Sequence, residues 1–108
     1  MNFKKISAKP PYYAVIFTST LKSDNPAYHQ MAAKMVALAE NQPGFLGEES
    51  ARQDLGITIS YWQDLDSIKQ WKANLDHREA QEKGQSDWYA GYQIKICRVE
   101  RAYDFLAI

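Results

Sequence analysis

The residues best suited to chemistry in this chain are His77 and the large aromatic rings on either side of it. Between positions 56 and 103 these rings are Tyr61, Trp62, Trp71, Trp88, Tyr89, Tyr92 and Tyr103. A domain of 108 residues rarely uses so many large rings unless they line a pocket or an interface. A neutral imidazole can accept a proton from a phenol, so His77 is a candidate general base. Its alternative role is packing, with a hydrogen bond to a backbone carbonyl.

Two tryptophans are candidates for the wall of such a pocket. Trp71 belongs to an apolar stripe at helical spacing, which is typical of core packing and also allows contact with a ligand. Trp62 has polar neighbours on its strand face, and this suits either a cavity wall or a dimer interface. The stripe is Leu65, Ile68, Trp71 and Leu75.

Trp88 and Arg52 complete the set of candidate binding residues. Trp88 lies near an expected turn with two tyrosines, where it could form the rim of a pocket or a dimer contact. The guanidinium of Arg52 could bind a quinone oxygen or an acidic substrate, although surface pairing with Glu49 or Glu100 is its ordinary role. The other histidine, His29, has no partner that the sequence identifies.

Four strands and two main helical regions are predicted to position these residues. Strands are expected at 12–20, 45–52, 57–63 and 91–105 from their β-branched and aromatic content and the turn residues around them. Asn25 followed by Pro26 predicts one helix start, and Asp64 predicts the next. Asp76 with Glu79 resembles a capping box for a further short helix, closed by Gly84. His77 would then lie near a helix start, where the dipole disfavours the imidazolium form.

The order strand, helix, strand, strand, helix, strand predicts an α+β fold of the ferredoxin-like, split βαβ type with an antiparallel sheet. Two helices can cover only one face of such a sheet. The first strand nevertheless carries apolar residues on both faces, with Val15 and Phe17 on one and Ala14 and Ile16 on the other. Because soluble monomers rarely expose a large apolar face, we predict a homodimer with the two sheets packed face to face.

Composition narrows the classes of function and partner. The 108 residues suit a single domain, 1–108, with residues 1–10 as a loose N-terminal arm. Thirteen basic residues balance thirteen acidic ones, which disfavours nucleic-acid and membrane-surface binding. There is one cysteine, Cys97, and no apolar run long enough for a signal peptide or membrane span, so a cytoplasmic protein is expected. No clustered ligand set predicts a metal site, and no glycine-rich motif predicts a nucleotide or flavin cofactor.

The sequence resembles the antibiotic biosynthesis monooxygenase (ABM) family, in the branch whose reactions are unassigned. The resemblance runs from about Tyr12 to Phe105, and its strongest parts are 44–52, 56–62 and 71–92. It implies the dimeric α+β barrel fold and a pocket in each subunit between the helices and the sheet. That pocket would be lined by Trp62, Trp71 and His77.

The resemblance also implies a choice of activities. The haem-degrading branch has an Asn on the first strand and a His ten residues after a helical Trp. Here the first strand has no Asn, and Gln81 stands ten residues after Trp71. The leading hypothesis is therefore a cofactor-independent monooxygenase for a small aromatic or quinol-like substrate. His77 would be the base, with Trp62, Trp71, Arg52 and Trp88 binding the substrate. The alternatives are a non-catalytic small-molecule binding or stress-response module and, less favoured, a haem-binding protein that uses His77.

Overall fold

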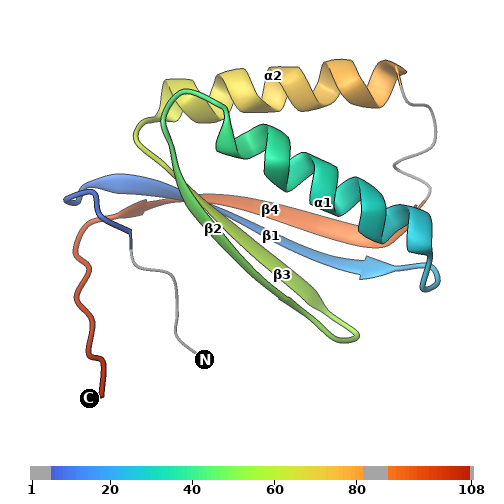
Figure 1. Ribbon diagram of the computed structural model, residues 1–108, viewed down its shortest axis with the longest axis horizontal. Helices are drawn as coiled ribbons and strands as arrows, with labels where there is room; N and C mark the ends of the chain where they lie inside the picture. Colours follow the sequence, from blue (N-terminus) through green and yellow to red (C-terminus); the bar gives the residue numbers. More distant parts are fainter. Residues whose placement is uncertain (1–5, 82–87, 108) are drawn as a thin grey trace.

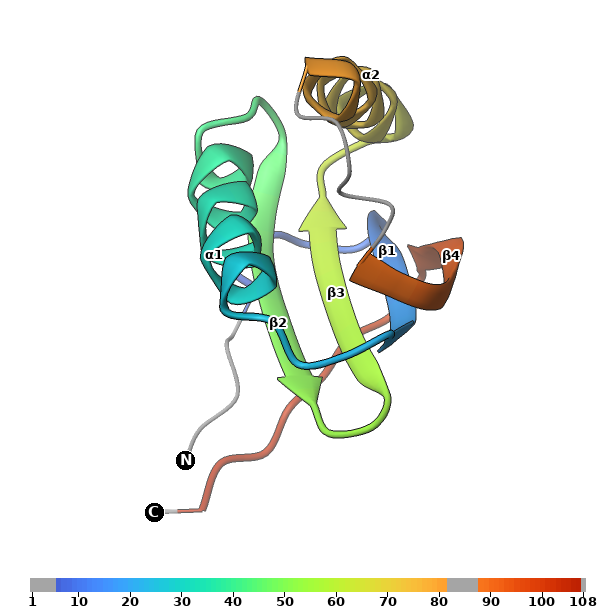
Figure 2. The same ribbon diagram turned by 90° about the vertical axis from the view of Figure 1, so that its right-hand side faces the viewer.

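The computed structural model describes residues 6–81 and 88–107, with side chains described as far as Asp76 in the first range. A four-stranded antiparallel sheet carries two helices on one face (Figures 1 and 2). The spatial order of the strands is β2-β3-β1-β4, which is the predicted ferredoxin-like arrangement. The elements are β1 (Tyr12–Leu21), α1 (Pro26–Glu40), β2 (Phe45–Arg52), β3 (Gly56–Trp62), α2 (Leu65–Gln81) and β4 (Tyr89–Val99).

Both predicted helix starts are confirmed by their caps. The Asn25 side chain accepts a hydrogen bond from the Ala27 backbone N–H at 2.9 Å, and Pro26 occupies the first turn. Asp64 accepts from the Ser67 backbone N–H at 2.8 Å. The Ser67 hydroxyl, followed by this backbone N–H, holds the pKa of the Asp64 carboxyl below its usual value. The local sequence therefore places the start of each helix directly.

The predicted break in the second helical region is wrong. Residues 65–81 form one continuous helix, which contains neither glycine nor proline. Asp76 does not begin a new helix; its carboxylate accepts from Lys72 Nζ at 3.2 Å, one turn earlier. His77 therefore lies within a helix and not at its positive end, so the argument from the dipole does not apply to it.

The last strand is shorter than predicted, ending at Val99 and not at 105. Val99 pairs with Tyr12, the first residue of β1. Two prolines, Pro10 and Pro11, precede Tyr12, and proline has no N–H to continue a ladder. Residues 100–107 consequently leave the sheet without regular structure and lead away from it (Figure 1).

The alternation along the strands separates two faces of the sheet. Val15 and Phe17 share one face, as predicted; with Ser19 they point toward the helices and pair with Ser60, Thr58 and Gly56 of β3. The opposite face carries Ala14, Ile16 and Ile59 and has no helix over it. The site is thus positioned between the helix-facing side of the sheet and the two helices.

Candidate functional site

A cavity of about 680 Å³ lies between the two helices and the sheet. This volume falls in the range of small-molecule sites. Apolar side chains of both helices line it, among them Met31, Met35, Ile68 and Leu75. Few apolar residues are buried in the described part of the chain, namely Tyr12, Ala14, Ala39, Trp62 and Ile68. The helices therefore stand over the sheet and leave room for a ligand.

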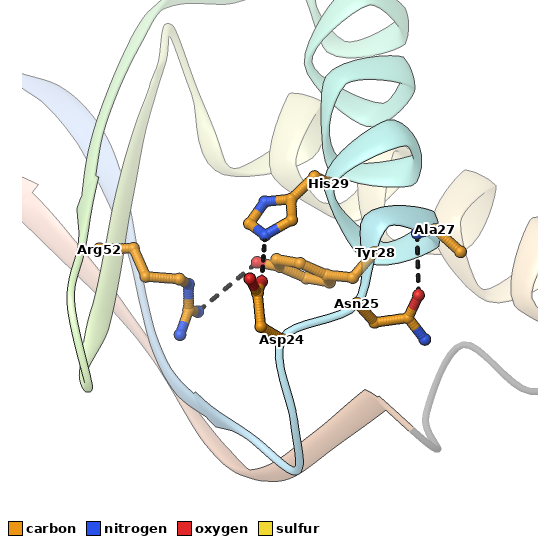
Figure 3. A network of polar contacts seen from close by, with 6 residues as sticks. All are labelled: Asp24, Asn25, Ala27, Tyr28, His29 and Arg52. Atoms are coloured by element: carbon orange, nitrogen blue, oxygen red, sulfur yellow. Dashed lines mark hydrogen bonds and ion pairs between the residues drawn. The ribbon is translucent and has the colours of Figure 1, made fainter.

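Arg52 supplies a cation to this cavity. Its guanidinium donates hydrogen bonds to the Ser19 carbonyl at 3.3 Å and to the Ser19 hydroxyl. It also donates to the Tyr28 hydroxyl at 3.5 Å (Figure 3). Its Cζ lies 5.5 Å from the centre of the Tyr28 ring, within cation–π range. To reach Ser19 on β1, the side chain crosses Gly56 on β3, where a Cβ would lie 2.1 Å from Arg52 Cζ. The absence of a side chain at Gly56 makes this path available.

Arg52 does not form the surface ion pair that the sequence favoured. Glu49, three residues earlier on β2, points to the other face of the sheet and accepts a hydrogen bond from the Tyr61 hydroxyl at 2.7 Å. Burial and this carboxylate raise the pKa of Tyr61 to about 12. The ion pairs found in the described part of the chain join His29 with Asp24 and Lys72 with Asp76. Within that part, no carboxylate pairs with Arg52.

Aromatic rings gather beside Arg52 at the start of β4. Tyr28 lies edge-on to both Trp88 and Tyr89, with ring centres 6.0 and 5.7 Å away. Tyr89 and Tyr92 each lie 5.5 Å from the Phe17 ring. Burial, followed by the neighbouring Tyr28, raises the pKa of the Tyr89 phenol. These rings all line the cavity, so Trp88, Tyr89 and Tyr92 lie on the helix side of the sheet.

The two tryptophans proposed from the sequence lie at the other end of the cavity. Trp71 lines it and stacks on Trp62 at 6.1 Å between ring centres. Trp62 has no exposed surface and is packed between Phe45 and Trp71, with its indole N–H donating to Ser60 at 2.9 Å. Trp71 therefore touches the cavity, while Trp62 supports it from behind.

The two histidines occupy different parts of the fold. His77 lies on α2, and its side chain is outside the described residues. Its position is nine residues after Ile68, or about two and a half helical turns. His29 on α1 has a partner that the sequence did not reveal: its Nε2 lies 2.7 Å from Asp24 Oδ1 (Figure 3). Asp24 directly precedes the Asn25 cap, and the turn into α1 brings it back to His29, a contact that spacing alone does not predict.

Asp24, His29 and Arg52 also border a second, smaller hollow of about 410 Å³, which Asp54 lines as well. His29 and Arg52 line both hollows and so mark the boundary between them. The described residues contain no group of three or more His, Cys, Asp or Glu side chains arranged to hold a metal ion. In the same part of the chain, neither helix is long and apolar enough to cross a membrane.

Comparison with known proteins gives a family match and a common fold. The model of the antibiotic biosynthesis monooxygenase family matches residues 11–83. The uncharacterised protein YqjZ of Bacillus subtilis (strain 168) is 45% identical over 103 residues, which cover 94% of this chain and 90% of that protein.

Solved structures share the fold at low identity. SnoaB, a cofactor-independent oxygenase from Streptomyces nogalater, superposes with a TM-score of 0.70 at 15% identity, covering 86% of this chain and 97% of SnoaB. A conserved protein from Methanosarcina mazei Go1 has a TM-score of 0.69 at 14% identity, covering 82% of this chain and 92% of its own. The match to the family model over most of the sequence, together with this shared architecture, shows that the chain belongs to the antibiotic biosynthesis monooxygenase family.

Proposed function

We propose that this protein binds a small aromatic molecule of the anthrone or quinol type in the cavity between the helices and the sheet and oxygenates it. The observation that carries the proposal is the cavity itself, which combines aromatic walls with the half-buried guanidinium of Arg52. Flat apolar walls suit a ring system, and a single cation suits the oxygen of that ring system. The fold shared with SnoaB supports a reaction that needs no metal or organic cofactor.

The proposed reaction uses molecular oxygen as its second substrate. A base removes an acidic proton, and the electron-rich anion of the substrate adds oxygen to give a peroxide. The peroxide takes up a proton and loses water, so that a CH₂ group becomes a C=O group. One oxygen atom enters the product and the other leaves as water, and the substrate supplies all four electrons.

His77 remains the base proposed from the sequence, with Trp71, Trp88 and Arg52 contacting the substrate and Trp62 supporting Trp71. The described stripe of α2 that lines the cavity comprises Ile68, Trp71, Lys72, Leu75 and Asp76. A helix with 3.6 residues per turn brings position 77 to the side opposite Ile68. Replacement of His77 therefore distinguishes a base on α2 from a base elsewhere in the cavity.

The test is oxygen consumption with an anthrone as substrate, in buffer treated with a chelator. We expect one oxygen molecule consumed per ketone formed, at a rate above that of the buffer. A loss of at least about a hundredfold in His77→Ala, with no loss in the exposed-site control Lys69→Ala, would assign the base. A wild-type rate no higher than the buffer rate with anthrone and quinol substrates would overturn the oxygenase proposal.

A non-catalytic binding module is the second candidate, and the same cavity supports it. Its signature is an increase in melting temperature with an aromatic ligand, without oxygen consumption. A Soret band on addition of haem that disappears in His77→Ala would instead favour the haem-binding alternative.

We also propose that the protein is a homodimer formed through the sheet face opposite the helices. This face presents Ile57, which is 40% exposed, beside Ile16 and Ile59. The C-terminal segment adds Tyr103 and Phe105, exposed at 95% and 83%. Aromatic residues this exposed on a segment leading away from the sheet fit contacts with a second copy.

Light scattering after size exclusion tests the dimer. We expect the mass of two chains for the wild type and for Gln70→Glu, which adds a charge to an exposed part of α2. Ile59→Glu should shift the mass toward one chain, because it buries a carboxylate in the proposed interface. A single-chain mass for the wild type at all concentrations would refute the dimer.

A further inference from the structure

At the start of α1, one end of the cavity combines a cation, a histidine paired with a carboxylate, and aromatic rings. These groups suit an acidic phenol, which specifies the kind of ligand in the proposed function. We infer that the ligand binds with an ionised phenolic oxygen on Arg52 and that the Asp24–His29 pair accepts its proton. This assignment rests on the proposed aromatic ligand, but it concerns binding and ionisation only and does not depend on oxygen chemistry.

The first step of the argument is the state of Arg52. Its described hydrogen bonds go to a carbonyl and two hydroxyl groups, all of them neutral. A half-buried guanidinium favours an anion because its charge is only partly solvated. An ionised ligand oxygen at the cavity surface would supply that charge through a charge-assisted hydrogen bond.

The second step is the geometry of the proton acceptor. A carboxylate can only accept hydrogen bonds, so the 2.7 Å contact requires His29 to donate from Nε2 to Asp24. In the neutral ring, Nδ1 is then the acceptor that can take a proton. The Asp24 carboxylate would then face the protonated ring across this contact. In this step the phenolic O–H bond breaks, its electron pair stays on the oxygen, and the proton moves to His29.

The third step is proximity. His29 and Arg52 line the same two hollows, and the Tyr28 ring contacts both, with its centre 5.2 Å from the His29 ring and 5.5 Å from Arg52 Cζ (Figure 3). Both residues border the aromatic cavity, where the ring system of the ligand would lie.

The charged groups around His29 are Asp24, Arg52 and Asp54, with the phenol of Tyr28 beside them. Asp24 brings a negative charge to the His29 ring and Arg52 a positive one, and an anion bound on Arg52 would offset that positive charge. Asp54 is exposed to solvent, which weakens its repulsion of a bound phenolate. Ionisation of the ligand and protonation of His29 are therefore expected to occur together.

The experiment uses 2-hydroxyanthraquinone, which carries one phenol, is not an oxygenase substrate of the proposed type, and changes its visible spectrum on ionisation. We expect the wild-type protein to bind it as the phenolate at a pH where the free molecule is neutral. Unsubstituted anthraquinone serves as the matched probe without the phenol. A bound hydroxyanthraquinone that ionises at the same pH as the free molecule would overturn the inference whatever the variants do.

Two variants separate the roles of the cation and the base. Arg52→Gln should weaken binding of the hydroxylated probe about tenfold or more and leave anthraquinone binding unchanged, with Arg52→Lys retaining part of the preference. The control Lys69→Gln removes an exposed charge of α2 and should change neither. Equal losses for both probes in Arg52→Gln, or no loss for either, would contradict the assignment of the anion to Arg52.

His29→Gln should still bind the phenolate but release the proton to the solvent. Calorimetry at pH 7.5 in buffers of different ionisation enthalpy counts these protons. We expect close to none for the wild type and about one per bound probe for His29→Gln. Equal proton release would refute the role of His29. Phenolate binding without oxygen consumption would refute the oxygenase proposal alone, while oxygen consumption without phenolate binding would refute only this inference.

Discussion

Replacing Gly56 with alanine should dislodge Arg52 from Ser19 and Tyr28. An added Cβ would lie 2.1 Å from both Cζ and Nη2 of Arg52, whereas ordinary van der Waals contact begins at 3.4 Å. The φ angle of Gly56 is not positive, so alanine brings no backbone strain of its own. The guanidinium must therefore move by more than about 1 Å, which breaks its hydrogen bonds to Ser19.

The cost follows from the burial of Ser19, which is 2% exposed. Leaving its buried hydroxyl without a partner costs about 1–3 kcal/mol. For a domain of this size, a loss of about 2 kcal/mol lowers the melting temperature by roughly 10 °C. The same variant should bind 2-hydroxyanthraquinone less tightly, because the cation no longer faces the cavity.

Urea unfolding of a double-mutant cycle tests this reasoning. In an Arg52→Ala background the clash is absent, so Gly56→Ala should cost much less than in the wild type. Gly91→Ala is the matched control, because its Cβ would meet nothing closer than Thr20 Oγ1 at 3.9 Å. If Gly56→Ala destabilises the protein equally with and without Arg52, the close contact with the guanidinium is not the cause and the argument fails.

Two further outcomes are expected from the packing and the caps. Trp62→Ala should lower the free energy of unfolding by about 3–5 kcal/mol, because the ring is fully buried. Trp71→Ala should lower it by less, because Trp71 lies at the cavity surface. Urea unfolding measures both losses, and a larger loss for Trp71→Ala would contradict this assignment. Because folding lowers the pKa of Asp64, its ionised carboxylate stabilises the folded state at pH values above the usual pKa of a carboxyl group. This stabilisation is lost as the pH falls through the lowered pKa. Asp64→Asn, which keeps a capping oxygen, should therefore lose less thermal stability than the wild type between pH 7 and pH 3.

The sequence by itself determined the order of the elements and the direction of the strand side chains. Asn25-Pro26 and Asp64 set the helix starts because capping is a local interaction between neighbouring residues. The period of two along β1 assigned Val15 and Phe17 to one face, since alternation is a property of the extended chain. The family resemblance came from the same local motifs and is confirmed by the family match.

Only the tertiary structure decided which polar residues meet in the cavity. Arg52 reaches Ser19, 33 residues away, because three strands align Arg52, Gly56 and Ser19 side by side. The pairing of His29 with Asp24 depends on the backbone conformation of the turn that leads into α1. The spacing of the two residues in the sequence does not predict this contact. The continuity of α2, by contrast, is a local property: residues 65–81 contain neither glycine nor proline, and Lys72 pairs with Asp76 one turn later. Local rules fix how each segment folds, whereas contacts between distant segments depend on strand register, which no single segment contains.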